Sequence, residues 1–307
     1  MESVRNPLTN CVIQSVYDVH MTTEQSDERP TTPLMKAVCV KDIDAAIQQV
    51  EGLLHAGEDP NQIDVACNSV PLLEAWSSGN IGVIQALIYA GADGKIVAKL
   101  PYDLTWSFAY NDLEATMLII KSGFTLDHLY SSNEQGERMC GWDNLLANLL
   151  TDNLSEHIKQ LMPYGIMEFL HAFDCVGDAP LGCMARDGHI EQSEWLLSQH
   201  ADVNLQCESL NGNTALDRAI ESNDVAMTKL LLSAGANPNI PTSMWITATD
   251  RAVNFKSDIE FRKKESRNVA RSIEIRDMIL EASASFPHPT YPNGKRPSQW
   301  PPEPKDR

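Results

Sequence analysis

Four side chains of the types that bind zinc occur within a stretch of 19 residues: His171, Cys175, Cys183 and His189. Imidazole nitrogens and thiolates are ligands that zinc prefers, so a fold that brought these four together would create a metal site. His189 with Asp174 or Asp187 suggests acid–base chemistry instead, but no nucleophile or oxyanion-donor pattern accompanies them. The chain has no Gly-rich phosphate loop, H-E-x-x-H, G-x-S-x-G or EF-hand pattern, so we expect neither an enzyme nor a cofactor.

The charge of the chain restricts its partners. Its 307 residues include 42 Asp and Glu against 24 Lys and Arg, a formal net charge of −18. Residues 254–307 hold 11 basic and 8 acidic residues, a net charge of +3, whereas residues 1–253 hold 13 and 34, a net charge of −21. Such a surface repels nucleic acid, because nucleic-acid binding depends on basic residues, and it attracts a basic protein.

Cysteine usage and hydropathy indicate the compartment. The seven Cys are odd in number and form no C-x-x-C pair, which is typical of reduced thiols rather than a disulfide framework. Residues 1–30 lack the apolar core of a signal peptide, and no stretch approaches the roughly 20 apolar residues of a membrane span. We therefore expect a cytoplasmic protein that does not enter a membrane.

Three segments of the chain align without a gap. They begin at Val70, Ala179 and Thr214, and each closes 21 residues later with Gly or His followed by Ala, as in Leu230-Leu231-Leu232-Ser233-Ala234-Gly235-Ala236. Repetition of this kind predicts stacked copies of one supersecondary unit. The segments resemble ankyrin repeats, which start with a T-P-L-H-x-A pattern and finish with L-L-x-x-G-A-x-x-N.

Weaker copies fill the spaces between these segments, starting at Thr32, Tyr102, Asn144 and Thr247. The closing residues 57, 91, 123, 165, 200 and 235 are separated by 34, 32, 42, 35 and 35 residues, near the ankyrin period of about 33. The resemblance covers residues 31–284. It implies an all-α solenoid of about six to seven helix-turn-helix repeats with short finger loops.

The departures from the pattern outline the domain organisation. We expect an N-terminal leader or cap over 1–30, the ankyrin-repeat array over 31–253, an atypical helical C-terminal capping repeat over 254–284, and a tail with seven Pro over 285–307. The loop 124–143 is about ten residues longer than its counterparts. Long insertions in a solenoid project from one face, often the binding face.

The resemblance also offers structural roles for the chemical candidates. Cys183 falls where a small residue packs on a first helix, and His189 stands where ankyrin repeats use His for hydrogen bonds between repeats. Asp217 and Asp250 replace the usual His and are predicted to hydrogen-bond within the helix or finger.

Finger residues and the exposed side of each first helix line the concave groove of ankyrin repeats, which implies a set of partner-binding residues. The residues at those positions are Trp106, Tyr110, Trp142, Asp143, Asp152, Asp178, Arg186, Asp187, Asn211, Asn213 and Glu221. The aromatic residues would supply buried anchors and the carboxylates would select a basic partner. Alternatively, Trp106 and Trp142 fill gaps in imperfect repeats, and the carboxylates are a solvated face.

The leading hypothesis is a non-enzymatic protein–protein interaction module that binds a basic partner through an acidic groove and fingers. In the sharper form of this hypothesis, the chain is similar to bacterial ankyrin proteins that act as immunity partners and occlude the active site of a basic toxin. Two alternatives stay open. The chain is a scaffold or effector that recruits a polyproline reader through its tail, or a metal-binding, enzyme-associated protein using residues 171–189.

Overall fold

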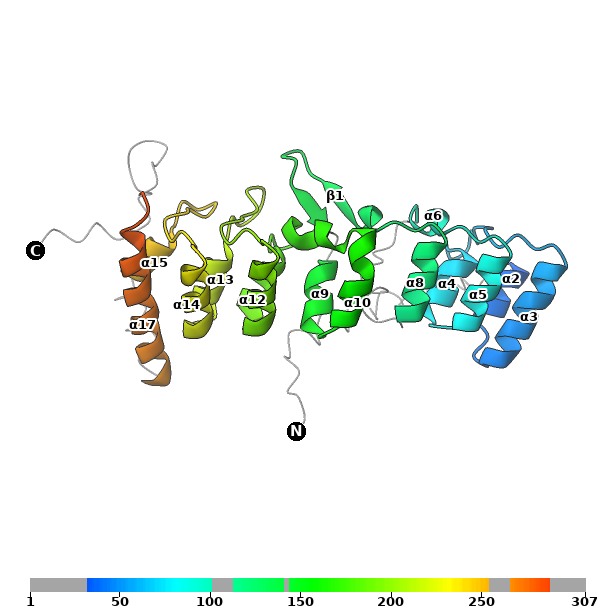
Figure 1. Cartoon of the computed structure of the whole chain (residues 1–307). Helices are drawn as coiled ribbons and strands as arrows, with labels where there is room; N and C mark the ends of the chain where they lie inside the picture. The colour runs from blue at the N-terminus through cyan, green and yellow to red at the C-terminus, as the bar shows by residue number, and fades with distance from the viewer. Residues whose placement is uncertain (1–31, 101–112, 141–143, 254–265, 288–307) are drawn as a thin grey trace, which may run out of the picture. The chain divides into compact units, whose positions relative to one another are not determined.

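The computed structural model describes residues 32–100, 113–140, 144–253 and 266–287. The chain divides into two compact units, residues 1–100 and 101–307. Within each unit most helices pack as consecutive pairs, and loops between the pairs form the fingers (Figure 1). None of the helices in these described ranges is long and apolar enough to cross a membrane.

Unit 1 contains two helix pairs and one short helix. These elements are α2 (Pro33–Val38), α3 (Ile43–His55), α4 (Pro71–Ser77), α5 (Ile81–Tyr89) and α6 (Gly94–Val97). The Thr32 side chain accepts a hydrogen bond from the Met35 N–H and Pro33 opens α2, which confirms the predicted helix start. Leu34, Trp76 and Leu87 are buried, so each pair covers the apolar face of the other.

Unit 2 continues the repeats with longer connections. Its helices are α8 (Leu113–Lys121), η1 (Leu126–Leu129), α9 (Leu145–Thr151), α10 (Ser155–Leu161), η2 (Met162–Tyr164), η3 (Ile166–His171), α11 (Pro180–Asp187), α12 (Ile190–Ser198), α13 (Ala215–Glu221), α14 (Val225–Ser233), α15 (Ala248–Val253) and α17 (Ser266–Ser283). The first helices α11 and α13 pack against each other, as do the second helices α12 and α14. This stacking confirms the all-α repeat architecture.

The predicted helix ends have the expected backbone conformation. Gly91, Gly165 and Gly235 have φ angles of 94°, 96° and 92°, in the left-handed region that glycine adopts most easily. His200 takes the same place after α12 with φ 66°. The register of the repeat is therefore maintained even where the closing residue is not glycine.

The long insertion adds a feature that the all-α expectation lacked. Strands β1 (Tyr130–Ser132) and β2 (Arg138–Cys140) pair antiparallel, with Tyr130 opposite Cys140. The tight connection between them contains Gly136 at φ 79°. β2 also bonds to Phe173, through Cys140 N to Phe173 O at 2.7 Å and Phe173 N to Arg138 O at 2.8 Å. The hairpin is thus attached to the repeats that follow it.

Helix α17 closes the described part of unit 2. It has 18 residues, against nine in α14, it packs on α14 and α15, and its Ile275 and Ile279 are buried. The assignment of this helix to a terminal capping repeat remains a prediction. The predicted domain boundaries remain predictions, and residues 1–31 and 254–265 lie outside the described residues.

Candidate protein-interaction surface

Three finger loops of unit 2 are joined to one another by hydrogen bonds. They precede α11, α13 and α15 and comprise residues 174–178, 207–213 and 242–246. Asn211 Nδ2 donates to Val176 O of the first finger at 3.3 Å. Ser243 of the third finger donates to Asn211 O from its backbone N at 3.1 Å and from Oγ at 2.9 Å. The fingers therefore form one continuous edge of unit 2.

The hairpin is attached to the middle finger. Glu137 Oε1 accepts from Glu208 N at 2.6 Å, and Asn133 Nδ2 donates to Ser209 Oγ at 3.1 Å. Partial burial would raise the pKa of Glu137, but hydrogen bonds from Ser209, Asn133 and the Glu208 amide outweigh it and lower that pKa. A shallow cavity lined by Glu137, Arg138, His171, Phe173, Leu205 and Glu208, among others, lies at this junction.

The tips of the fingers expose apolar side chains to solvent. Four residues share this property and are called the fingertip surface: Val176 (42% exposed), Leu210 (39%), Met244 (66%) and Trp245 (39%). Trp245 has φ 59°, a conformation that costs a bulky L-residue about 1 kcal/mol or more. Trp245 N donates to Thr242 O at 2.8 Å and Thr242 N to Ile246 O at 2.9 Å, so a closed turn holds the indole in this position.

The fingers carry acidic but no basic side chains. None of residues 174–178, 207–213 and 242–246 is Lys or Arg, whereas the middle finger contributes Glu208 and the hairpin contributes Glu134, both exposed. Residues 101–253 as a whole hold 21 acidic against 7 basic residues, a net charge of −14. An apolar strip without cations favours ligands that combine apolar and basic groups.

Three arginines, Arg186, Arg218 and Arg251, form a chain of ion pairs along the first helices, here called the arginine ladder. Asp178 Oδ2 accepts from Arg186 Nη1 at 2.7 Å and Asp178 Oδ1 from Arg218 Nε at 2.7 Å. Glu221 then joins Arg218 to Arg251, at 3.1 Å and 2.9 Å. Because α11, α13 and α15 each contribute one arginine, the ladder connects three successive repeats.

Asp178 is the buried centre of this ladder. Its side chain is 1% exposed, compared with 13% for Arg218 and 40% for Arg186. Burial raises the pKa of Asp178, and Arg218 and Arg186 oppose that effect. Removing the charge of Asp178 or of Arg218 would leave the other charge in a poorly hydrated environment, so these two residues stabilise the fold only as a pair.

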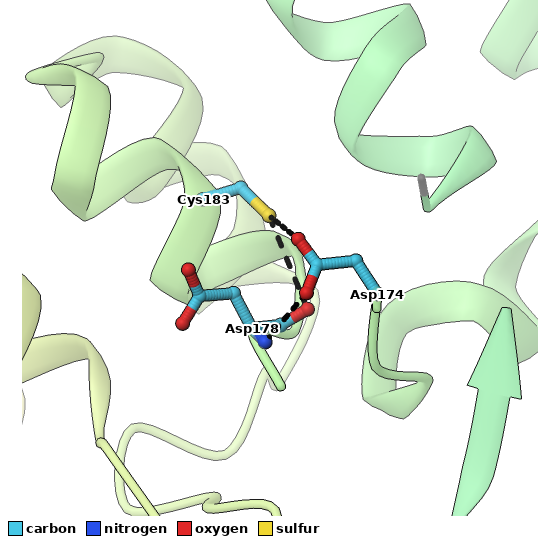
Figure 2. A group of neighbouring side chains, drawn as sticks. All are labelled: Asp174, Asp178 and Cys183. Atoms are coloured by element: carbon cyan, nitrogen blue, oxygen red, sulfur yellow. Dashed lines mark hydrogen bonds between the residues drawn. The ribbon is translucent and has the colours of Figure 1, made fainter. Parts of the chain in front are cut away.

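Asp174, Asp178 and Cys183 form the one group within the described ranges whose possible metal-ligand atoms lie within 4.8 Å of one another. Cys183 Sγ points at Asp174 Oδ2, 3.6 Å away, while the Asp178 carboxylate turns to the opposite side of its backbone (Figure 2). Asp174 Oδ1 already accepts from the N–H groups of Val176 and Asp178, at 3.0 Å and 2.8 Å. Burial, assisted by Asp174, raises the pKa of the Cys183 thiol well above its ordinary value. The carboxylates of this group are already held by two arginines on Asp178 and by two backbone N–H groups on Asp174, so they serve as hydrogen-bond acceptors within the fold.

The residues first considered as zinc ligands do not form one site. Among His171, Cys175, Cys183 and His189, only Cys183 belongs to that group. His171 Nε2 instead accepts from Asp202 N at 3.2 Å, and Cys175 is exposed on its finger.

Comparison with known proteins identifies the repeat. The family model for ankyrin repeats, in a form with three copies, matches residues 145–242, from α9 to the finger before α15. The chain contains ankyrin repeats. Among proteins of curated function, none matches this sequence.

Solved ankyrin-repeat structures are similar to this ankyrin-repeat protein in fold. The ankyrin repeat domain of Bcl-3, a member of the IkappaB protein family, is 17% identical with a TM-score of 0.51, over 71% of this chain and 92% of that chain. The human ASB11 ankyrin repeat domain is also 17% identical, with a TM-score of 0.50, over 71% and 90%. A chain in the complex of a Bdellovibrio bacteriovorus predatory endopeptidase with its immunity protein is 20% identical, with a TM-score of 0.48, over 67% and 99%. These likenesses carry no information about function.

The predicted partner-binding residues of this ankyrin-repeat protein have different surroundings. Trp106, Tyr110, Trp142 and Asp143 lie outside the described residues. Asp178, Arg186, Asp187 and Glu221 belong to the arginine ladder, where Asp187 contacts Arg186 at 3.3 Å. Asp152 is exposed at the end of α9, Asn211 is exposed on the middle finger, and Asn213 is half-buried before α13. The structure therefore groups the ladder residues together and places Asn211 on the middle finger, bonded to Val176 of the neighbouring finger.

Sequence reasoning missed Arg218, Arg251 and the fingertip surface. The Asp217-Arg218 and Asp250-Arg251 pairs recur one repeat apart, and this recurrence could have indicated the ladder. Asp217 and Asp250 themselves hydrogen-bond to Thr214 and Thr247 at the helix starts, as predicted. The sequence contains Met244 and Trp245 side by side, but no helical pattern marked them as binding residues.

Proposed function

We propose that this ankyrin-repeat protein is a non-catalytic binding module whose fingertip surface and neighbouring acidic side chains hold a basic protein partner. The observation that carries the proposal is the exposure of Met244 and Trp245 on fingers that contain no Lys or Arg. Buried aromatic anchors contribute most of the affinity in protein interfaces, and surrounding carboxylates favour a basic partner and speed its association. Solenoid repeats commonly present such extended surfaces to other proteins.

The arginine ladder indicates which of the predicted carboxylates are available to contact a partner. Asp178 is buried and bonded to two arginines, so we assign it to positioning α11 and α13 rather than to partner contact. Asp187 and Glu221 are each 41% exposed and Asp152 is exposed, so these three remain candidates for partner contact on the first helices. Trp106, Tyr110, Trp142 and Asp143 remain candidates on sequence grounds.

The test begins with capture of partners by the tagged full-length chain from its native lysate, followed by purification of the main captured protein. The affinity of that protein is then measured for the Trp245→Ala variant and for the control Tyr89→Ala, which removes an aromatic that is 96% exposed on unit 1. We expect Trp245→Ala to weaken binding by about 30-fold, the loss typical of an anchor, and Tyr89→Ala to leave it unchanged. Equal affinities for the two variants would refute the proposed surface.

A second measurement addresses the acidic groove. Asp152→Asn and Asp187→Asn together should weaken association and reduce its dependence on salt concentration, because screened charge attraction is removed. An unchanged salt dependence would separate these two carboxylates from partner binding. If the partner is an enzyme and loses its activity in the complex, the immunity form of the hypothesis gains support.

A further inference from the structure

The cavity at the junction of the hairpin and the middle finger is separate from the fingertip surface. Its volume is about 590 Å³, within the range of roughly 300–1,000 Å³ that is usual for ligand sites. Hairpin residues 135–138 and residues 205, 206 and 208 contribute most of its lining. Among the described residues only this insertion forms a hairpin, so no other described repeat has an equivalent cavity.

Part of the lining is apolar and is fixed by the core. Phe173 is buried and Leu205 is half-buried, and both belong to one hydrophobic cluster with Cys207 and Met139. The backbone of Phe173 is also held by its two bonds to β2. An occupant of the cavity therefore needs an aliphatic stem that can lie against these side chains.

The carboxylates of the lining lack a cation. Glu137 accepts from Glu208 N and Asn133 Nδ2, both at 2.6 Å, and from Cys207 Sγ at 3.6 Å. These donors are neutral and they lower the pKa of Glu137, so its carboxylate is ionised at neutral pH. Glu208 is exposed, and no ion pair joins either carboxylate to a Lys or Arg of the described ranges.

The two lining residues that could carry positive charge are engaged elsewhere. Arg138 Nη1 donates to Glu168 O at 3.1 Å and pairs with the Glu168 carboxylate, and its guanidinium lies 5.2 Å from the centre of the Tyr130 ring. His171 Nε2 accepts from Asp202 N at 3.2 Å, and an accepting nitrogen carries no proton, so this ring is neutral in the structure. The unbalanced charge of the cavity is therefore negative.

We propose that this cavity receives an arginine side chain of the protein partner. The inference rests on the proposed function for the existence of that partner, and it adds the side chain that the partner must present. The arginine stem packs on Leu205 and Phe173, and its guanidinium donates to Glu137 and Glu208. Leu210 of the fingertip surface follows Glu208 by two residues, so one partner segment can use both places.

Arginine fits this cavity better than lysine for two reasons. Its planar guanidinium has five donors, which can serve two carboxylates that come from different elements. It is also less strongly hydrated than an ammonium group, so it enters a partly apolar cavity at a lower cost in desolvation.

The test titrates the full-length chain with N-acetyl-arginine methylamide and follows backbone amide resonances by NMR. The guanidinium is the only charge of this probe. We expect the Gly136 and Glu208 resonances to shift and to saturate, because both residues line the cavity. The matched probe contains citrulline, whose neutral urea group has the shape of a guanidinium, and it should shift neither resonance. The corresponding lysine probe should bind more weakly than the arginine probe.

A pair of variants locates the bound charge. Glu208→Gln removes one carboxylate and should weaken binding of the arginine probe about threefold, as expected for a partly exposed charge pair. The control Glu134→Gln removes an exposed carboxylate of the same hairpin that does not line the cavity, and it should leave binding unchanged. The Cys140 and Phe173 amides, which bond between β2 and the repeats, report that the hairpin stays attached in each variant.

Three results would overturn the proposal: shifts that do not saturate, equal binding of the citrulline probe, and equal affinities of the two variants for the arginine probe. Equal binding of the lysine probe would overturn the assignment to arginine.

The probe titration requires no partner, which separates this inference from the proposed function. If the arginine probe binds and Trp245→Ala leaves partner affinity unchanged, the arginine site stands and the fingertip surface fails. If partner affinity depends on Trp245 and the arginine probe does not bind, the fingertip surface stands and the arginine site fails. With both in place, Glu208→Gln should weaken partner binding and Glu134→Gln should weaken it less.

Discussion

Counted from Thr32, repeats 4, 5 and 6 contain the helix pairs α9–α10, α11–α12 and α13–α14. Repeats 5 and 6 use acidic side chains in opposite ways at the same place in the fold. Repeat 6 opens with Thr214 and Asp217, which bond reciprocally across the first turn of α13 in a capping box. Repeat 5 has Ala179 at the N-cap and Gly182 three residues later, so neither side chain of a capping box is present. Asp178, one residue earlier, instead bonds to arginines of repeats 5 and 6. In repeat 5, a contact between repeats stands in place of the local cap of repeat 6. Asp178 and Asp217 are both buried, so they stabilise the fold rather than contribute to the charge of the surface.

The strongest test of this difference removes Asp178. Asp178→Asn leaves Arg186 and Arg218 without their shared carboxylate, and Arg218 is only 13% exposed. We expect the free energy of unfolding of unit 2 to fall by about 3 kcal/mol, the lower part of the range for breaking a buried pair, because Arg186 can still reach water. Urea denaturation measures this change. Asp187→Asn, at an exposed position of the same ladder, should cost less than about 1 kcal/mol.

A second test installs the box of repeat 6 in repeat 5. Ala179→Thr with Gly182→Asp restores both box residues, yet we expect it to destabilise unit 2 by roughly 2 kcal/mol. A Cβ at position 182 would lie 3.4 Å from Asp178 Cβ and 3.5 Å from its Oδ1, so a new carboxylate would stand beside an existing one. Gly182→Ala meets only ordinary contacts and should stabilise α11 by about 0.5–1 kcal/mol. Thermal unfolding distinguishes the expected loss of stability in the double variant from the expected gain in Gly182→Ala. A stabilised double variant would contradict our account of repeat 5.

A smaller effect is expected when the box itself is broken. Thr214→Ala removes the hydroxyl that accepts from Asp217 N at 3.3 Å and donates to Asp217 Oδ2 at 2.9 Å. The loss should be about 1 kcal/mol, as for other N-caps, and clearly less than for Asp178→Asn. If Thr214→Ala proved the more damaging change in urea denaturation, the contact between repeats would not be the stronger of the two.

The smallest effect concerns Glu137, an acid that is neither a cap nor part of the ladder. Its pKa is lower in the folded chain than in the unfolded chain, where Glu titrates near 4.3. Its contribution is therefore complete above that value and is lost as the pH falls through the lowered folded pKa. We expect less than about 1 kcal/mol, seen by NMR as an acid-dependent shift of the Glu208 amide. Glu137→Gln should abolish that shift, and its persistence would assign the titration to another group.

The two kinds of contact differ in how well they can be read from sequence. The capping boxes were within reach, because Thr214 and Asp217 are three residues apart and the helical period places them together. The same local logic predicted the left-handed residues that end the second helices. Asp178 and Arg218 are 40 residues apart, and their bond depends on the exact stacking of two repeats and on side-chain rotamers. Exposure of Trp245 depends on a strained turn that no periodic pattern indicates.

The hairpin has a consequence for the order of folding. Contacts in repeat arrays are mostly between neighbours, so such chains can fold by local propagation from any repeat. Asn133 and Glu137, however, bond to residues 71–76 positions later in the chain, beyond the whole of repeats 4 and 5. Closing so long a loop is entropically costly before the intervening repeats are in place. We therefore expect the hairpin to form its bonds to Glu208 and Ser209 last, after the repeats between them have folded.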